Sequence, residues 1–271
     1  EDVGKLTHGA ADSLVDFNRA GCPLAEIVTE PDMHTPEEVV AFLNALRNVL
    51  LYGGISDCDM EKGQLRCDAN ISVRLKGDPK LGPKVELKNL NSISGVKNGV
   101  IYEVKRQIEC LKQGERVVHQ TRRWDADAGL SFPMRTKEEV HDYRYFPDPD
   151  LRPLVLSEAF LEGLPVYETP FDKQRRFFQQ YDLPYTLTAV LCPDIQLCNY
   201  FEEAVAHYAN PKNIANWIVN DLLRDLRQFG GSLPLSECKI RPADLADLVR
   251  LLDEGVLTKT AAQQIFALMF E

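Results

Sequence analysis

The strongest alternation of polar and apolar residues in the chain lies between Glu61 and Ser92. Read with a period of two residues, its first segment places polar side chains on one face and apolar side chains on the other. The polar face carries Arg66, Asp68, Asn70, Ser72 and Arg74, and the apolar face carries Cys67, Ala69, Ile71, Val73 and Leu75. After a turn rich in Gly, Pro and Asp, Glu86 and Lys88 alternate with Val85 and Leu87. The pattern predicts two adjacent strands with an apolar back and a charged front.

The charged front of these two strands has two interpretations. One is the solvent-facing side of an antiparallel sheet, which needs no ligand. The other follows from the residue types: Arg and Asn recur where an exposed strand more often carries Thr, Lys or Glu, and the second strand runs into Asn89 and Asn91. Asn tolerates unusual backbone geometry. Carboxylates are good ligands for a hard cation, and guanidinium groups bind phosphate oxygens well. The front is therefore also a candidate phosphate-plus-metal site.

The first 31 residues are predicted to be rich in β structure. Short strands are expected at 13–17 and 24–29, whereas residues 1–9 favour a solvated loop. In the second of these strands, Glu26 falls on the same face as Leu24 and Val28. A carboxylate in an apolar strand is costly unless a cation or hydrogen-bond donors meet it. An edge position, a pairing with Arg19 and a functional role all remain open for Glu26.

A helix is predicted to begin after Thr35. Thr at the N-cap, Pro36 at the first helical position and Glu38 at the third are agreeing start signals. Gly53 and Gly54 end the helix. Its apolar stripe consists of Val39, Phe42, Leu43, Leu46, Val49 and Leu50. Such a stripe indicates a buried side, and we expect this helix to cover the apolar back of the sheet.

A second long helix is predicted to begin at Ser92 or Ser94 and to end at Gly114. The residues expected on its buried side are Val96, Val100, Val104, Ile108 and Leu111. Its polar side carries Lys97, Lys105, Arg106 and Lys112 among few acidic residues. A solvated face is the usual role of such a set of side chains.

Beyond this helix, residues 116–123 and 130–135 are predicted to form a hairpin around a turn at 125–129. The hairpin gathers Arg122, Arg123, Trp124 and Arg135, a set that suits either contact with a nucleotide or RNA, or packing of the Trp into the core. The next segment, 141–153, is stiffened by Pro and is typical of a rigid loop at a domain edge. From Phe171 onward, apolar stripes separated by Pro and Gly turns predict an all-helical docking domain.

Composition narrows the class of protein. With 271 residues, 44% of them hydrophobic, the chain can form two modest domains, and we expect an α+β fold with a sheet domain at 1–157 and an all-α domain at 158–271. The net charge of −10 argues against a broad electrostatic grip on nucleic acid, so any RNA contact must be local. Seven cysteines without a CxxC or Cys/His cluster indicate reduced thiols and no zinc site. No segment suits a membrane span or a signal peptide, which favours a cytoplasmic protein without a membrane partner.

Several long motifs resemble one protein family. LRCDANISVR (65–74) and VELKNLNS (85–92) are similar to segments of the B subunit of the tRNA-dependent amidotransferases, which act on aspartyl- and glutamyl-tRNA. LVDFNRAGCPLAEIVTEPD (14–32), HDYRYFPDPDL (141–151) and NPKNIANWIVNDLL (210–223) continue the resemblance in the family's order, so that it covers most of the chain. An archaeal glutamate-specific paralogue carries an inserted domain after its catalytic domain, and the short span here leaves no room for one.

The resemblance implies a glutamine synthetase-like antiparallel sheet cradle that holds Mg²⁺ and ATP. In this family, ATP phosphorylates the side-chain carboxylate of Glu or Asp misacylated onto tRNA. Ammonia that the amidase (A) subunit releases from glutamine then displaces the phosphate, giving Gln-tRNA(Gln) or Asn-tRNA(Asn); a small (C) subunit completes the complex. The implied activity is that of an ATP-dependent carbon–nitrogen ligase with glutamine as amido donor. The sequence does not decide between Glu-tRNA(Gln) and Asp-tRNA(Asn) as substrate.

The resemblance also implies roles for individual residues. Glu1, in the EDxGK motif, and Glu26, in the PLxEIV motif, match Mg²⁺ ligands. The implied catalytic residues are Arg66, Asp68, Asn70 and Lys88, and the implied nucleotide-binding residues are Arg66, Lys88 and Arg144. His141 is a weaker candidate, because a structural role explains it equally well. No side chain is required as a covalent nucleophile, since ATP activates the carboxylate and ammonia is delivered.

Two other functions are compatible with the sequence: a non-catalytic module for tRNA binding or assembly of the same complex, and a degenerate relative that has lost the chemistry. The net negative charge argues against a free-standing RNA binder. The presence of Glu26, Asp68 and Lys88 argues against a relative that has lost the chemistry. The family's N-terminal Gly-Leu-Glu-x-His segment and its C-terminal tail domain have no counterpart here. We therefore expect this stretch to belong to a longer protein and to lack transamidation activity by itself.

Overall fold

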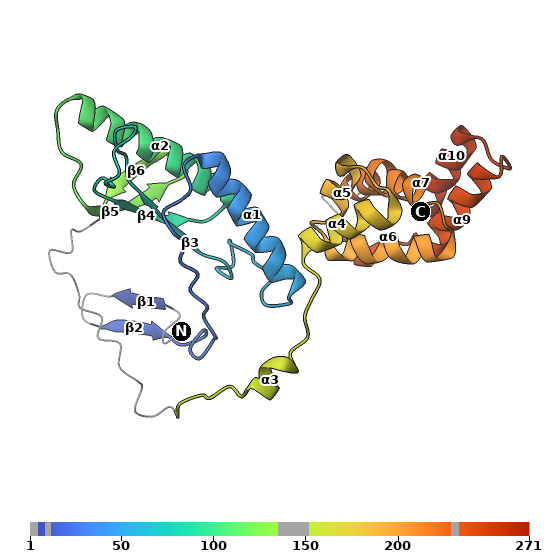
Figure 1. Ribbon diagram of the computed structural model, residues 1–271, viewed down its shortest axis with the longest axis horizontal. Helices are drawn as coiled ribbons and strands as arrows, with labels where there is room; N and C mark the ends of the chain where they lie inside the picture. The colour runs from blue at the N-terminus through green and yellow to red at the C-terminus, as the bar shows by residue number, and fades with distance from the viewer. Residues whose placement is uncertain (1–4, 9–11, 135–151, 229–232, 271) are drawn as a thin grey trace. The chain divides into compact units, whose positions relative to one another are not determined.

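The computed structural model describes residues 5–8, 12–134, 152–228 and 233–270 (Figure 1). The chain divides into two units, 1–39 and 40–271. The first unit contains an antiparallel hairpin of β1 (Lys5–His8) and β2 (Ser13–Asp16). The predicted strand at 13–17 is thus confirmed, whereas the solvated loop expected over 1–9 is wrong for residues 5–8, because these residues pair with β2.

The strand expected at 24–29 is absent from the structure. Residues 22–30 form no ladder, and the side chains of Leu24 and Val28 are 56% and 90% exposed. Apolar alternation alone does not make a strand where no neighbouring strand accepts its backbone hydrogen bonds. Glu26 is exposed as well, so it is not a carboxylate buried in an apolar strand.

The second unit contains a four-stranded sheet in the order β3-β4-β5-β6. Its strands are β3 (Cys67–Ile71), β4 (Val85–Leu90), β5 (Gln120–Asp125) and β6 (Leu130–Pro133). The pairs β3–β4 and β5–β6 are antiparallel, but β4 and β5 run parallel. The expectation of a wholly antiparallel sheet is therefore wrong. A long helix joins β4 to β5 and returns the chain to the same end of the sheet, which is the connection that parallel neighbours require.

Strand β3 is shorter than its alternating pattern predicted. It ends at Ile71, where a side chain of the covering helix replaces the neighbouring strand. Gln107 Nε2 donates to the carbonyl oxygen of Ile71 at 3.1 Å, and Gln107 Oε1 accepts from the Val73 amide at 3.1 Å. Ser72 and Arg74 therefore lie beyond the strand and do not extend its polar face.

Helix α1 (Pro36–Tyr52) begins as the sequence predicts. The Thr35 hydroxyl accepts a hydrogen bond from the Glu38 amide at 3.1 Å, and the Glu38 carboxylate accepts from the Thr35 amide at 3.0 Å. These reciprocal bonds form a capping box. At the other end, Gly54 has φ +62°, a left-handed conformation that glycine adopts without strain.

The helix that covers the back of the sheet is α2 (Ile93–Lys112), and the expectation that α1 would do so is wrong (Figure 1). The Ser92 hydroxyl caps α2 by accepting from the Gly95 amide at 2.9 Å. At Gly99 an added Cβ would lie 3.1 Å from Leu90 Cδ2 and 3.3 Å from Leu87 Cδ1. The helix axis can approach the sheet closely only because this position lacks a side chain. Only two residues separate β4 from α2, so the chain folds directly back onto the strand that it has just left.

The buried side of α2 differs from the predicted stripe. Val96 and Val100 are buried as expected, but Leu111 is 47% exposed. Glu103 and Gln107 occupy the buried side in place of the later apolar residues. The apolar stripe places the helix, and the polar pair then meets the ends of β3 and β5 (see below).

The remainder of the second unit is helical, as the sequence predicts. Its elements are α3 (Glu158–Glu162), α4 (Pro170–Tyr181), α5 (Tyr185–Leu191), α6 (Ile195–His207), α7 (Pro211–Trp217), a π-helical turn (Ile218–Leu222), α8 (Leu223–Gln228), a 3₁₀ turn (Leu235–Glu237), α9 (Pro242–Asp253) and α10 (Lys259–Phe270). The predicted stripe of Ile214, Trp217, Ile218, Leu222 and Leu226 is buried in the core that joins them. Proline occupies the first position of α4, α7 and α9, where its missing amide proton costs nothing.

Candidate functional site

The front face of the sheet carries the charged residues that the alternation placed there. On β3, Asp68 and Asn70 are exposed while Ile71 is buried. On β4, Glu86 and Lys88 are half-buried, whereas Val85 and Leu87, which alternate with them, are fully buried. The register pairs Asn70 with Glu86, so the four polar side chains project from one side of two hydrogen-bonded strands. The predicted shared front is confirmed.

Lys88 lies at the centre of this face. Its Nζ is 2.5 Å from Asp68 Oδ2 and 3.1 Å from Glu86 Oε1. Glu86 in turn accepts a hydrogen bond from the Thr121 hydroxyl on β5, at 2.8 Å. The array Asp68–Lys88–Glu86–Thr121 thus crosses three strands, and we call it the front array.

The hydrogen bonds of the front array shift the pKa values of Lys88 and Glu86. Partial burial acts to lower the pKa of the Lys88 ammonium, but the hydrogen bonds to Asp68 and Glu86 outweigh it and raise that pKa. Burial acts to raise the pKa of Glu86, but the bonds from Thr121 and Lys88 prevail and hold it below its usual range. Both groups are therefore charged at neutral pH, and Lys88 is a half-exposed cation flanked by two carboxylates.

The other sequence-predicted site residues are distributed differently. Arg66 is exposed and immediately precedes β3. Glu26 belongs to the first unit, whereas the front array belongs to the second. Glu1, His141 and Arg144 lie outside the described residues. The structure therefore brings Asp68, Asn70 and Lys88 together and leaves the metal-ligand assignments of Glu1 and Glu26 as predictions.

Two members of the front array, Glu86 and Thr121, were not among the predicted site residues. Glu86 belonged to the predicted front by its alternation with Val85 and Leu87, but it was not assigned a role. Thr121 lies on β5, and the parallel register that places it beside Glu86 has no local signature in the sequence. Asn89 was noted correctly for unusual geometry: it has φ +66°, and its side-chain amide donates to the Trp124 carbonyl at 3.0 Å.

A buried charge cluster lies behind the sheet. Glu103 is fully buried, and its carboxylate accepts from Arg106 Nη2 at 2.6 Å and from Gln107 Nε2 at 2.9 Å. Arg122 approaches the same carboxylate at 3.8 Å, and its Nε donates to the Ser131 hydroxyl at 2.7 Å. Burial and the neighbouring Arg106 cation lower the pKa of Arg122. This cluster holds α2 to the β5–β6 hairpin.

The hairpin residues that the sequence grouped together lie on different faces of the sheet. Arg122 is held by Glu103 and Ser131, and Trp124 is 3% exposed, so both pack on the back of the sheet. Arg123 points to the front, in register with Lys88, and lies 3.6 Å from Asp125 in an exposed ion pair. Arg135 lies outside the described residues. Core packing is therefore the correct interpretation for Arg122 and Trp124.

The front face presents one ammonium group between two carboxylates, with the Asn70 amide on the same side of the sheet. With one ammonium and two carboxylates, the front array carries a formal net charge of −1. Within the described stretches of the chain, no three His, Cys, Asp or Glu side chains gather where they could ligate one metal ion.

Comparison with known proteins identifies the family. The family model described as the GatB/GatE catalytic domain matches residues 1–162, and the one described as the GatB domain matches residues 199–271. The chain belongs to the GatB/GatE catalytic domain family. The first match covers more than half of the sequence and includes the front array.

Curated relatives of this GatB/GatE family chain agree with that assignment. It is 56% identical over 274 residues to the B subunit of aspartyl/glutamyl-tRNA(Asn/Gln) amidotransferase from Opitutus terrae, covering all of this chain and 56% of that protein. The B subunits from Carboxydothermus hydrogenoformans and Caldicellulosiruptor saccharolyticus are each 45% identical, with 57% and 58% of their lengths covered. The chain thus spans little more than half the length of these relatives. None of its described helices is both long and apolar enough to cross a bilayer.

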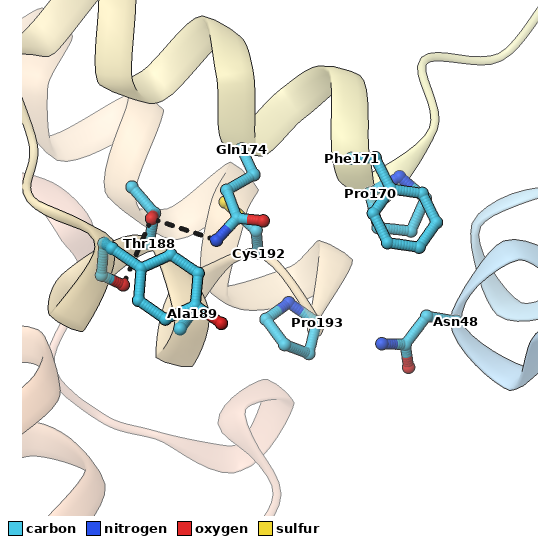
Figure 2. Close-up of a pocket in the computed structure, with 9 residues that line it drawn as sticks. Asn48, Pro170, Phe171, Gln174, Thr188, Ala189, Cys192 and Pro193 are labelled. Atoms are coloured by element: carbon cyan, nitrogen blue, oxygen red, sulfur yellow. Dashed lines mark hydrogen bonds between the residues drawn. The ribbon is translucent and has the colours of Figure 1, made fainter. Parts of the chain in front are cut away.

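A small cavity of about 140 Å³ is lined by residues of α1, α4 and α5 and of the turn after α5 (Figure 2). It is lined by Asn48, Pro170, Phe171, Gln174, Tyr185, Thr188, Ala189, Cys192 and Pro193. Gln174 Nε2 donates to the Thr188 hydroxyl at 3.2 Å, which satisfies the polar groups of one wall. With no charged side chain in its lining, this cavity is a poor candidate for a phosphate site.

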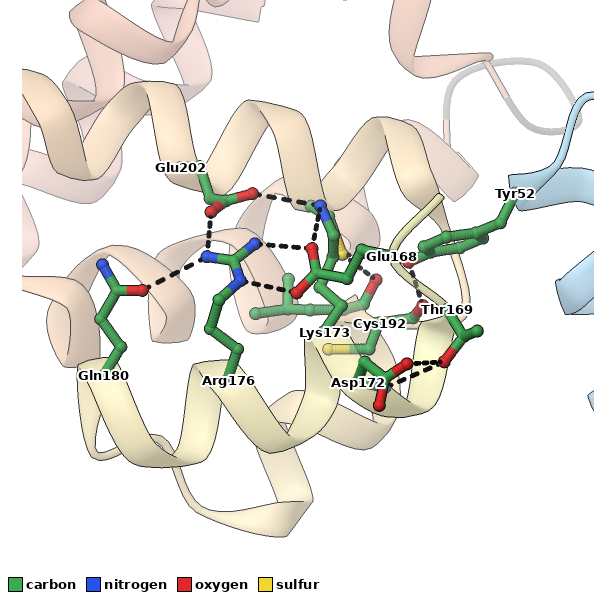
Figure 3. A network of polar contacts seen from close by, with 11 residues as sticks. Tyr52, Glu168, Thr169, Asp172, Lys173, Arg176, Gln180, Cys192 and Glu202 are labelled. Atoms are coloured by element: carbon green, nitrogen blue, oxygen red, sulfur yellow. Dashed lines mark hydrogen bonds and ion pairs between the residues drawn. The ribbon is translucent and has the colours of Figure 1, made fainter. Parts of the chain in front are cut away.

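A second charged cluster, shown in Figure 3, ties α4 to α6. Arg176 lies 2.7 Å from Glu168 and 2.5 Å from Glu202, and Lys173 lies 3.2 Å from Glu202. Hydrogen bonds to Glu168 and Glu202 raise the pKa of Arg176. Each cation already has a carboxylate partner, so the cluster acts as a structural tie between two helices.

The thiol beside the front array should be unreactive. Burial, assisted by the charge of Asp68, raises the pKa of Cys67 to about 11. At pH 8.5 its thiolate fraction should be about 100-fold lower than that of an ordinary cysteine, and alkylation by iodoacetamide should slow accordingly. Peptide mass spectrometry should follow Cys67 in the native protein and, as the control, in urea. Equal rates in both states would contradict the half-buried position of this thiol.

Proposed function

We propose that this chain forms the ATP-dependent part of the B subunit of a tRNA-dependent amidotransferase. In this proposal it phosphorylates the side-chain carboxylate of Glu or Asp on a misacylated tRNA, and ammonia from an amidase partner converts the product to the amide. The observation that carries the proposal is the front array: a half-exposed Lys88 held between Asp68 and Glu86 on a rigid sheet. Residues 1–157 would form the catalytic cradle, and residues 158–271 a helical domain.

The chemistry explains why such a site needs cations and fixed carboxylates. A carboxylate is a poor electrophile, so one of its oxygens must first become a leaving group. The bond between the terminal phosphorus of ATP and its bridging oxygen breaks, and a new bond joins that phosphorus to the carboxylate oxygen. Ammonia then attacks the carbonyl carbon, loses a proton and displaces phosphate. Positive groups must hold the transferring phosphoryl oxygens, and water must be excluded because it would hydrolyse the activated carboxylate.

The residues of the chain can be assigned to these tasks. Lys88 and Arg66 would bind phosphate oxygens, with Arg144 as a further nucleotide contact. Asp68 and Asn70 would orient the phosphates, the substrate carboxylate or water bound to the metal. Glu86 and Thr121 would position Lys88, because Glu86 contacts both of them.

Mg²⁺ and ATP are the groups that this function needs. Mg²⁺, when bound, neutralises phosphate charge, and Glu1 and Glu26 are its proposed ligands. The carboxylates of the front array already bind the Lys88 ammonium, so they would support the metal through water or second contacts. The amidase (A) subunit, the small (C) subunit and the misacylated tRNA are the proposed partners.

The proposal is tested on the full-length protein reconstituted with its amidase and small subunits. Asp68→Asn should lower ATP-dependent amidation by about 10²-fold or more, because the Lys88 ammonium loses the carboxylate that holds it in place. Glu26→Gln should lower it as well and should raise the Mg²⁺ concentration needed for half-maximal activity. Asp247→Asn, at an exposed ion pair on α9, is the matched control and should leave turnover unchanged.

The outcomes separate catalysis from a supporting role. Loss of ATP turnover with retained tRNA binding supports the kinase function of the front array. Unchanged turnover in Asp68→Asn would overturn it, and the chain would then be better explained as a non-catalytic tRNA-binding or assembly module of the same complex. If Glu26→Gln leaves the Mg²⁺ dependence of the activity unchanged, Glu26 is not a ligand of the metal ion.

A further inference from the structure

The outward side of α2 carries a row of lysines that the front array does not use. Lys97, Lys105 and Lys112 are eight and seven residues apart, which places them within about 80° of arc and along about 22 Å of the helix. Lys105 and Lys112 are exposed, and Lys97 is half-buried. Among the described residues, no ion pair involves Lys105 or Lys112. This is a local positive strip on a chain whose net charge is −10.

The acidic residues of α2 do not neutralise this strip. The helix contains two of them: Glu103 is buried in the cluster with Arg106 and Arg122, and Glu109 is exposed. Arg106 is therefore already paired and does not belong to the row. Glu109 is the one exposed acid of α2, so the pair of exposed lysines, Lys105 and Lys112, keeps a net positive charge within this helix.

A cavity of about 330 Å³ opens beside the middle of the row. It is lined by Asn98, Ile101, Tyr102 and Lys105 of α2, by Trp124 of β5, and by Ala126 and Gly129 of the hairpin turn. The Tyr102 and Trp124 rings are 5.8 Å apart and tilted by 54°. The cavity therefore combines aromatic walls with an ammonium group and an amide at its edge. Its volume is in the range typical of ligand sites.

Two exposed lysines about 10 Å apart along the helix, Lys105 and Lys112, match a ligand with spaced negative charges rather than one small anion. An aromatic-walled cavity among those charges matches a base that is free to leave its stack, since a base can pack on an aromatic side chain. A duplex keeps its bases stacked and would offer only phosphates and 2′-hydroxyls. Single-stranded RNA supplies both the spaced phosphates and the unstacked bases.

We propose that this face of α2 binds an unpaired stretch of the substrate tRNA, with one base in the cavity against Tyr102 and the neighbouring phosphates on Lys105 and Lys112. The proposal rests on the proposed function, which makes tRNA the substrate, and it assigns the tRNA a contact surface separate from the front array. The strip supplies affinity and position, while the front array supplies the chemistry.

The test uses the full-length protein in complex with its amidase and small subunits and a fluorescently labelled tRNA. Binding is measured by anisotropy at several salt concentrations. The double variant Lys105→Ala/Lys112→Ala should bind about tenfold more weakly, and the slope of log affinity against log salt should fall by about two, because each lysine neutralises one phosphate. The rate at saturating tRNA should be unchanged. Tyr102→Leu, which keeps an apolar contact with Trp124 and removes the stacking ring, should weaken binding without changing the slope.

Two controls use the charges of the chain itself. Glu109→Gln removes the one exposed acid of α2 and should tighten tRNA binding, the opposite sign to the lysine variants. Lys259→Ala changes an exposed lysine of α10 and should leave both affinity and slope unchanged. Urea unfolding midpoints should verify that each variant is folded.

The proposal is overturned if the double lysine variant keeps the wild-type affinity and salt slope. It is also overturned if that variant fails to assemble with the amidase and small subunits on size-exclusion chromatography, because the face would then dock a protein. The front array is judged separately: if Asp68→Asn leaves turnover intact while the lysine variants weaken tRNA binding, the kinase assignment fails and the RNA-binding face stands.

Discussion

Replacing Lys88 by methionine should reduce ATP-dependent amidation by about 10³-fold while leaving the protein folded. Methionine keeps the unbranched apolar stem and removes the ammonium group that lies 2.5 Å from Asp68 and 3.1 Å from Glu86. The loss of a fixed donor to a transferring group typically costs about 10² to 10³ in rate. Here the two carboxylates also become an unneutralised pair, which repels phosphate. The turnover number should be measured from ATP consumption and from tRNA amidation in the reconstituted complex.

The Lys88 variant should also carry a pH signature. Burial raises the pKa of Glu86, and the bonds from Thr121 and Lys88 hold it down. Removing Lys88 therefore moves the Glu86 pKa upward, and the acid limb of the residual activity should shift to higher pH. Lys212→Met, on α7 and remote from the front array in the sequence, is the control and should change neither rate nor pH profile. Wild-type turnover in Lys88→Met would exclude Lys88 from the phosphate site.

Replacing Glu103 by alanine should lower the free energy of unfolding by about 3–5 kcal/mol, the cost expected when one partner of a buried ion pair is removed. Glu103 is fully buried, and the Arg122 side chain is only 11% exposed. Without the carboxylate, Arg122 keeps its bonds to Ser131 but loses its countercharge. Gln107, which closes the end of β3, also loses a partner. Urea denaturation followed by circular dichroism measures the change.

The Glu103 prediction has a matched control on the same helix. Glu109→Ala removes an exposed carboxylate further along α2 and should change stability by no more than about 0.5 kcal/mol. The double variant Glu103→Leu/Arg122→Met should recover part of the loss, because an apolar pair can replace a buried ion pair. A cost below about 1 kcal/mol for Glu103→Ala would show that solvent reaches Arg122 and that the cluster does not hold the hairpin to α2.

Much of the candidate site could be predicted because its signals are local. The period-two alternation at 66–71 and 85–88 indicated both strands of the front and assigned Asp68, Asn70 and Lys88 to one face. That these two strands share one front also followed from the alternation, but the contact between Asp68 and Lys88 is known only from the structure. The conformation around Glu26 could not be predicted in the same way, because an alternating segment becomes a strand only when a neighbouring strand pairs with it.

Sequence alone determined the elements whose signals lie within a few residues: the capping box at Thr35, a start of α2 at Ser92 or Ser94, the β5–β6 hairpin and the helices after Phe171. The tertiary structure decided what depends on residues far apart in the chain. The parallel β4–β5 register places Thr121 beside Glu86, 35 residues away. Gln107 ends β3 from 36 residues away, and Glu103 becomes a buried charge because Arg122 meets it. Local sequence patterns predict the secondary structure of neighbouring residues. The partners of a buried polar group come from distant parts of the chain, so they are set only when the chain packs.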